Sequence, residues 1–255
     1  MKKIFKIKNF IFLYQIKLKI REYKRFFKTL IYLFLIKTPI NLINNFIYNF
    51  FFQIKLKSII NNYTLNDKYV FTDHDWFFEK LPLFINYFTK NLTQKERIAD
   101  ILEIGSYEGR SAVFFDEFFN LKSFTAVDTW GGSDEHGDKI EQKMPGIEKN
   151  FDYNLKYFKN IIKIKSTSDH FFKKNIKYYD LIFVDGSHKK LFVTKDLDNS
   201  FKYLNKNGYL LIDDFNFIFY DLRDNVASAF IDFYQKNKKF IKIIYVYRQI
   251  LIKKI

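Results

Sequence analysis

The chain contains no cysteine, and its first 60 residues contain almost no acid. Without cysteine there are no disulfides and no thiolate-bound metal, and a reducing compartment is allowed. No run of 18 apolar residues occurs in those 60 residues, so we expect no membrane-spanning helix there. Lysines interrupt the apolar stretches and no small-residue cleavage site follows them, which is not the pattern of a signal peptide.

Positive charge is concentrated at the N-terminus. Residues 1–60 hold 13 Lys or Arg against the single acid Glu22, so they carry +12 of the total net charge of +15. The remaining 195 residues therefore carry only +3. This asymmetry predicts a basic extension over residues 1–60 and a separate α/β domain over residues 61–255.

The basic extension has the pattern of an amphipathic helix that ends before Pro39. Its apolar face is formed, at steps of three and four, by Ile16, Ile20, Tyr23, Phe27, Leu30 and Phe34. A basic stripe beside it is formed by Lys17, Arg21, Lys24 and Lys28. Such a helix suits an anionic membrane surface, which predicts a cytoplasmic protein resting on the inner membrane face. The alternatives are packing on the domain or a contact between copies of the chain in a homo-oligomer; nucleic acid is disfavoured because no recognisable module accompanies the charge.

The first half of the α/β domain predicts a nucleotide-type ligand. A short strand over 100–104 leads into a turn with Gly105 and Gly109, and a helix follows to about residue 119. The next strand, 123–127, ends on Asp128, which is placed to accept hydrogen bonds from ribose hydroxyls. The turn lacks the middle glycine of a dinucleotide motif, and Glu103 before it disfavours a pyrophosphate. A cationic ligand, S-adenosylmethionine, therefore fits better than NAD.

Two further apolar runs end on carboxylates 28 residues apart, at Asp185 and at Asp213-Asp214. A helix between them would bring both ends to one edge of a parallel sheet. Three carboxylates in one place repel one another unless a cation or a shared proton holds them, and all-oxygen ligation indicates Mg²⁺ or Mn²⁺. His188, three residues after Asp185, is the candidate general base, with His136 as a competitor. The alternative is that these acids cap helices and satisfy loop amides.

The remaining pattern completes a doubly wound, Rossmann-like α/β sheet of about seven strands. We expect strands over 161–165, 180–184 and 209–212, and one or two more within 240–252. The helix before the fifth strand should include Leu204 and end at Gly208, and another helix should cover roughly 219–236. Ser168 and Asp169 are predicted near the adenine, although Ser-Asp is also an ordinary helix start. Trp130 is expected either as wall packing or in the active site, and residues 131–148 as a solvated loop or a lid.

Residues 98–215 resemble the class I S-adenosylmethionine-dependent methyltransferases. More narrowly, they are similar to the metal-dependent sugar O-methyltransferases of the macrolide-glycoside type. The resemblance is carried by residues 102–111 (LEIGSYEGRS), 127–130 (VDTW), 184–188 (VDGSH) and 213–214 (DD). It implies metal ligands at Asp185, Asp213 and Asp214, although that family often has glutamate at the second position. The implied cofactor contacts are Glu103, Gly105, Ser106, Tyr107, Gly109, Ser111, Asp128, Thr129, Ser168, Asp169 and Asp185.

The expected activity is methyl transfer from S-adenosylmethionine to a hydroxyl of a sugar in a glycan or glycoconjugate. His188 would take the hydroxyl's proton and a metal ion would lower the hydroxyl's pKa. Two other classes stay open at this point. One is a nicotinamide-dependent oxidoreductase or a related hydroxylase on the same fold, and the other is a non-catalytic, membrane-associated scaffold.

Overall fold

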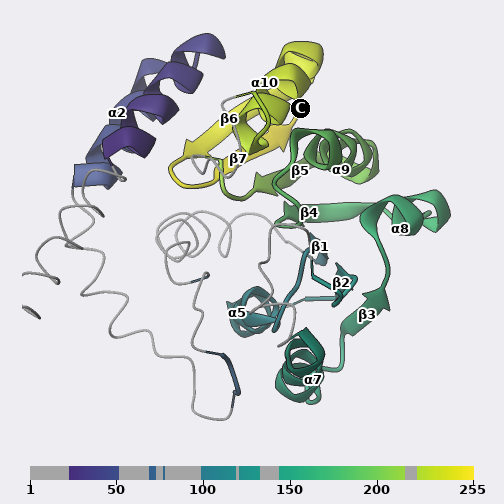
Figure 1. Cartoon of the computed structure of the whole chain (residues 1–255). Helices are drawn as coiled ribbons and strands as arrows, with labels where there is room; N and C mark the ends of the chain where they lie inside the picture. The colour runs from purple at the N-terminus through teal and green to yellow at the C-terminus, as the bar shows by residue number, and fades with distance from the viewer. Residues whose placement is uncertain are drawn as a thin grey trace, which may run out of the picture.

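Seven strands form one mixed sheet in the order β3-β2-β1-β4-β5-β7-β6 (Figure 1). The structure is a computed structural model, and it describes residues 23–51, 69–72, 77, 99–118, 121–132, 144–215 and 223–255. The strands are β1 (Asp100–Ile104), β2 (Ser123–Asp128), β3 (Ile161–Lys165), β4 (Tyr179–Val184), β5 (Leu204–Ile212), β6 (Ile241–Val246) and β7 (Ile250–Lys254). Strands β1 to β5 are parallel, whereas β7 is antiparallel to both of its neighbours. The predicted doubly wound sheet of about seven strands is confirmed.

The helices that connect the strands form two groups (Figure 1). In the first group α5 (Arg110–Phe118) contacts α7 (Met144–Leu155). In the second, α9 (Lys190–Tyr203) contacts both α8 (Ser168–Lys174) and α10 (Val226–Asn237), which is followed by a 3₁₀ turn, η2 (Lys238–Phe240). The central strands β1 and β4 are apolar and almost wholly buried, as strands covered on both faces must be, whereas the edge strand β3 is only half-buried.

The strand register places the predicted polar residues at one edge of the sheet. Ile104 at the end of β1 pairs with the ends of β2 and β4, Val127 and Val184, and Val184 in turn pairs with Ile212 of β5. The next residue on each strand, namely Gly105, Asp128, Asp185 and Asp213, therefore lies at the edge where the parallel strands end. We call this the carboxyl edge; it is where open α/β sheets bind ligands.

The helix before β5 is shorter than the sequence predicted. It ends at Tyr203, and Leu204 is already paired with Tyr179 as the first residue of β5. The expectation that Gly208 ends this helix is therefore wrong. Gly208 instead lies in an irregular stretch of β5, where a Cβ would come within 3.0 Å of the Asp180 carbonyl oxygen, so the close approach of β4 explains this glycine.

The helix expected from about residue 219 begins later. Residues 223–225 are bends, and α10 starts at Val226 because Asn225 caps it. The Asn225 side chain accepts the Ser228 N–H at 2.9 Å, and the Ser228 hydroxyl accepts the Asn225 N–H at 3.2 Å. This reciprocal pair fixes the start of the helix. Residues 216–222 lie outside the described part of the chain.

Two N-terminal helical segments pack on the far end of the sheet (Figure 1). Residues 23–35 are helical, and α2 (Ile40–Phe51) follows a turn that contains Pro39, which confirms the predicted break. The ring of Phe46 lies 6.4 Å from that of Tyr247, and the ring of Tyr32 lies 6.2 Å from that of Phe215. Residues 1–22, with the first turns of the predicted amphipathic face, lie outside the described residues. Among the helices that are described, none is long and apolar enough to cross a membrane.

Candidate active site

The turn after β1 lies directly against the turn after β4. Gly105 has φ +88°, and a Cβ at this position would lie 2.1 Å from the carbonyl oxygen of Asp185. The Asp185 N–H in turn donates to the Ile104 carbonyl at 2.8 Å. Only glycine fits such a backbone approach, so Gly105 joins the predicted cofactor turn to the predicted metal site.

Asp128, at the end of β2, is hydrogen-bonded to the turn after β1. We call this turn, residues 105–109, the cofactor turn. Asp128 Oδ2 accepts the N–H groups of Ser106 and Tyr107, both at 2.9 Å, and its Oδ1 accepts the Trp130 N–H at 2.8 Å. The carboxylate is half-buried, and its oxygens retain further acceptor capacity for hydroxyl groups. The ribose contact expected of Asp128 stays a prediction, and the structure adds a second role, that of fixing the turn.

Glu103 and Ser111, both predicted to contact the cofactor, are buried and hydrogen-bonded to each other. The Glu103 side chain is fully buried, and its Oε1 accepts a hydrogen bond from the Ser111 hydroxyl at the start of α5. The cofactor contacts expected of both residues stay predictions, and the structure adds a hydrogen bond between the end of β1 and the start of α5.

A distant segment, residues 69–72, is fastened to the same turn, which sequence reasoning missed. Glu108 is fully buried within the turn and accepts the Thr72 N–H at 2.9 Å and the Asn150 side-chain amide at 2.8 Å. Arg110 donates to the Thr72 carbonyl at 3.0 Å, and Asn154 donates to the Val70 carbonyl at 2.9 Å. The sequence signal for this contact is Glu108, an acid between two glycines of a turn. If such a carboxylate is buried, it needs hydrogen-bond partners from another part of the chain.

The residues after β2 form a wall of the site. Trp130 is buried; its indole N–H donates to the Tyr107 carbonyl at 2.9 Å, and its ring lies 4.8 Å from that of Phe151. Trp130 therefore has the expected packing contacts, and its place in the active site stays a prediction. The Thr129 hydroxyl accepts the Gly131 N–H at 3.2 Å. The loop or lid predicted over residues 131–148 is wrong for its last part, because α7 already begins at Met144. Residues 133–143, which include His136, lie outside the described residues.

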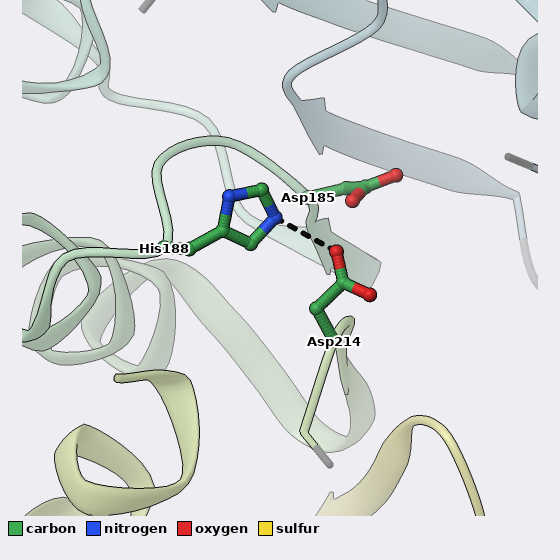
Figure 2. A group of neighbouring side chains, drawn as sticks. All are labelled: Asp185, His188 and Asp214. Carbon is green, nitrogen blue, oxygen red and sulfur yellow. Dashed lines mark hydrogen bonds and ion pairs between the residues drawn. The ribbon is translucent and has the colours of Figure 1, made fainter. Parts of the chain in front are cut away.

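Asp185, His188 and Asp214 form a cluster at the carboxyl edge (Figure 2). One ligand atom from each lies within 4.8 Å of the others, and His188 Nε2 is 2.7 Å from Asp214 Oδ2. Asp214 has φ +49°, a left-handed conformation that aspartate tolerates better than most residues. A contact of 2.7 Å between a ring nitrogen and a carboxylate oxygen requires a proton between them.

Asp213 is placed differently from the other two predicted metal ligands. It is buried, its Oδ1 accepts the N–H of Asp214 at 2.7 Å, and its side chain lines a small pocket together with His188 and Val226. The group whose ligand atoms lie within 4.8 Å of one another contains Asp185, His188 and Asp214, and metal binding by Asp213 stays a prediction. Asp213 shapes the turn that carries Asp214.

Ser168 and Asp169, predicted near the adenine, make contacts within the protein. Asp169 accepts the Lys195 ammonium at 3.1 Å, and Ser168 is hydrogen-bonded to Asp196 of α9. The Asp196 carboxyl also lies 3.8 Å from the position a Cβ would take on Gly186. Burial raises the pKa of Asp196 to about 7. Asp196, which sequence reasoning missed, therefore links the turn after β3 to the turn that carries Asp185.

Gln249 is a second residue that sequence reasoning missed. It precedes Ile250, which pairs with Ile212, so Gln249 stands beside Asp213 at the carboxyl edge. Its side chain is 1% exposed, and neither amide atom has a hydrogen-bond partner within the described part of the chain. A buried amide without partners is costly, which makes this position a candidate for contact with a bound molecule.

The comparison with protein families agrees with this geometry. Residues 102–215, a little under half of the chain, match the model of a family described as a methyltransferase domain. The matched segment runs from β1 to the turn after β5 and contains every predicted cofactor, metal and base residue. The match and the sheet order show that residues 102–215 are similar to a methyltransferase domain.

Several solved structures are similar to the chain. Fibrillarin from Aeropyrum pernix, solved with natively bound S-adenosylmethionine, is 14% identical with a TM-score of 0.47, covering 69% of this chain and 74% of that chain. The Podospora anserina methyltransferase PaMTH1 is 19% identical with a TM-score of 0.45, covering 61% and 71%. The N-methyltransferase NodS from Bradyrhizobium japonicum is 13% identical with a TM-score of 0.45, covering 62% and 86%. No curated protein sequence matches the chain.

Proposed function

We propose that the protein methylates a hydroxyl group of a sugar in a glycan or glycoconjugate. The observation that supports this best is the His188–Asp214 pair, 2.7 Å apart and next to Asp185, on the edge shared with the cofactor turn. A hydroxyl must lose a proton as it attacks a methyl group, whereas an amine attacks through its lone pair. Methylation of an oxygen acceptor therefore needs a general base, and His188 held by the Asp214 carboxylate can serve as one.

The cofactor turn has features that suit a bound ligand. Asp128 fixes the turn and offers acceptor capacity at the surface. The hydroxyl of Ser106 is buried in the turn and has no hydrogen-bond partner among the described residues, so a ligand group would satisfy it. S-adenosylmethionine bound here would supply a methyl group on a sulfonium centre, to be passed to the acceptor oxygen as the S–CH₃ bond breaks.

His188 and Asp214 would act as one unit. The acceptor's proton passes to the imidazole of His188, and Asp214 holds the ring through Nε2 and stabilises the positive charge that the ring acquires. Asp185 lies next to Asp214 on the same side of the imidazole (Figure 2) and accepts hydrogen bonds from neighbouring hydroxyls of the acceptor. Correct placement of the acceptor oxygen against the methyl group supplies much of the rate.

The same cluster suits a divalent cation. Oxygen ligands of one Mg²⁺ lie about 2.1 Å from the metal, hence at most about 4.2 Å from one another. The ligand atoms of Asp185, His188 and Asp214, within 4.8 Å of one another, are close to that span. Carboxylates are the ligands that Mg²⁺ and Mn²⁺ prefer, so Asp185 and Asp214 would hold the ion. An ion held by these residues would supply Lewis-acid polarisation of the acceptor hydroxyl.

The proposal is tested by cofactor binding and by methyl transfer. Calorimetry should show binding of S-adenosylmethionine and none of NAD, because the turn lacks a pyrophosphate site. Radiolabelled S-adenosylmethionine should then label hydroxyl-bearing acceptors in a screen of sugar nucleotides and lipid-linked glycans. His188→Ala should abolish labelling, with His170→Ala on the exposed surface of α8 as the matched control. Binding of NAD alone, or transfer to amines that does not depend on His188, would refute the assignment.

A further inference from the structure

The helical residues 23–35 present apolar side chains on two faces. One face is buried in the core of the domain and contains Phe26 and Leu33, together with Ile36 just after the end of the helix. At 100° per residue the opposite arc carries five large apolar side chains with exposures of 49% to 65%, namely Tyr23, Phe27, Ile31, Phe34 and Leu35. We call these five residues the apolar stripe. Apolar faces of a helix are ordinarily buried, and the described part of the chain covers only one of the two apolar faces of this helix.

The charge around the apolar stripe has one sign. Lys24 and Lys28 lie along one border of the stripe, and Lys37 is exposed just beyond the helix. Residues 23–51 contain no acid, and residues 1–60 together carry +12. Large apolar side chains bordered by lysines are the composition of helices that lie in the plane of an anionic bilayer surface.

We propose that the apolar stripe docks on an anionic lipid surface, with Lys24 and Lys28 at the level of the headgroups. Pairing the stripe with that of a second copy would bring two segments of +12 together, and like charges in contact repel. Anionic lipid offers the complementary charge, and each basic residue near such a surface adds to the attraction. The positive charge of residues 1–60 therefore favours binding to anionic lipid over pairing with a second copy of the chain.

The docked helix is joined to the candidate active site through its buried face. The Tyr32 hydroxyl accepts a hydrogen bond from the Asn225 side chain at 3.3 Å. The ring of Tyr32 lies 6.2 Å from that of Phe215, the residue that follows Asp214. Docking of the stripe would therefore hold the carboxyl edge close to the bilayer. A lipid-linked acceptor would be presented there, a point that rests on the proposed function, whereas lipid docking itself does not.

Co-sedimentation of the full chain with vesicles tests the docking directly. The protein should bind vesicles of mixed phosphatidylcholine and phosphatidylglycerol at low salt and bind pure phosphatidylcholine much more weakly. Replacing Phe27, Ile31 and Phe34 with Gln should weaken binding on the order of tenfold or more, because the apolar contact is lost. Lys24→Gln with Lys28→Gln should weaken it roughly tenfold at low salt and much less at high salt.

The matched control is a variant in which exposed apolar residues elsewhere on the domain are replaced with Gln. Tyr157 and Ile176 are 75% and 91% exposed, and their replacement with Gln should leave vesicle binding unchanged. Circular dichroism establishes that each variant is folded.

Failure of the full chain to bind anionic vesicles at low salt would overturn the proposal, as would binding that the stripe variant does not weaken. Sedimentation velocity showing a dimer that the stripe variant dissociates, without vesicle binding, would assign the stripe to a second copy instead. None of these readouts depends on methyl transfer.

Discussion

Asp214 adopts a left-handed backbone conformation, and this brings its carboxylate to His188. Its N–H is held by the Asp213 carboxylate, so the two adjacent acids have separate tasks. Asp213 fixes the conformation of the turn, and Asp214 presents the oxygen that meets the imidazole. The chemistry at this edge therefore depends on a conformation as much as on the presence of acids.

Removing the charge of Asp214 should separate catalysis from cofactor binding. Asp214→Asn keeps the shape of the side chain but no longer stabilises a protonated His188, so we expect kcat to fall by roughly 10²- to 10⁴-fold. The affinity for S-adenosylmethionine, measured by calorimetry, should stay nearly the same.

Asp128→Ala should show the reverse pattern, with chiefly weaker cofactor binding, because Asp128 fixes the cofactor turn. Asp198→Asn, on the surface of α9, is the control. Equal losses of affinity in the first two variants would contradict these roles.

The buried amide of Gln249 should be replaceable without loss of stability. An apolar side chain of similar size removes two polar atoms that have no partner among the described residues, so Gln249→Leu should raise the free energy of unfolding by about 1 kcal/mol. If the amide contacts the acceptor, the KM for the acceptor should rise in the same variant. Urea denaturation and steady-state kinetics measure the two effects. A clear loss of stability would show that the amide is paired in the folded protein.

At the scale of elements, the turn after β1 and the turn after β4 behave as one unit because their backbones touch at Gly105. A Cβ placed there would lie 2.1 Å from the Asp185 carbonyl oxygen, and φ is +88°. Gly105→Ala should therefore lower the free energy of unfolding by several kcal/mol, on the order of 3. It should also abolish cofactor binding, because both turns must move apart.

Gly146 in α7 provides the matched control for that substitution. No atom lies within 4 Å of the position its Cβ would take, and the residue is helical and exposed. Gly146→Ala should be neutral or stabilising by about 0.5–1 kcal/mol, because alanine favours a helix more than glycine does. Urea denaturation of both variants gives the comparison. Similar stability of the two variants would mean that the turns are not packed as described.

Asp196, between α8 and the turn after β4, should make stability depend on pH. Its folded pKa, about 7, is above the ordinary 3.8, so the folded state binds the proton more tightly than the unfolded state. Its favourable contribution is complete below pH 4 and is lost as pH rises to about 7, by at most about 4 kcal/mol. Asp196→Asn removes this dependence, so the stability of the variant relative to wild type should increase between pH 4 and 7. Thermal unfolding across this range, with Asp198→Asn as the control, measures it; a constant difference would contradict the raised pKa.

At the scale of the whole molecule, the proposed metal dependence can be tested by removing the ion. EDTA should abolish methyl transfer, and excess Mg²⁺ or Mn²⁺ should restore it, since Asp185 and Asp214 would otherwise repel each other around the acceptor. Cofactor affinity should be nearly unchanged, because the cofactor turn contributes no residue to the cluster. Full activity in EDTA would remove the ion from the proposed function.

The sheet and its carboxyl edge could be predicted from the sequence because each strand is a short apolar run with a polar end. The runs that end at Asp128 and Asp185 need no tertiary information to be recognised, and the parallel register then aligns their ends. The position of Asp213 could not be predicted in the same way. It depends on which of two adjacent acids turns inward, and that is decided by the backbone at Asp214.

Other differences arise where distant contacts override a local pattern. Leu204 fits the apolar face of a helix, yet it pairs with Tyr179 in the sheet. Glu103 is hydrogen-bonded to Ser111 at the start of α5, a partner that the local pattern did not show. For the N-terminal helix, periodicity predicted one apolar face, but it could not show that a second face, with Phe26 and Leu33, is the one that packs on the domain.

The packing of the N-terminal helices on β6 has a consequence for folding during synthesis. About 200 residues separate α2 from β6, the strand that it contacts. At about 5–20 residues per second, a ribosome needs roughly 10–40 seconds to add that stretch. Throughout this interval the nascent chain carries a helical segment whose two apolar faces both lack their final neighbours. A chaperone or a nearby bilayer would meet this segment before the sheet exists, so the proposed attachment to lipid would precede the completion of the sheet.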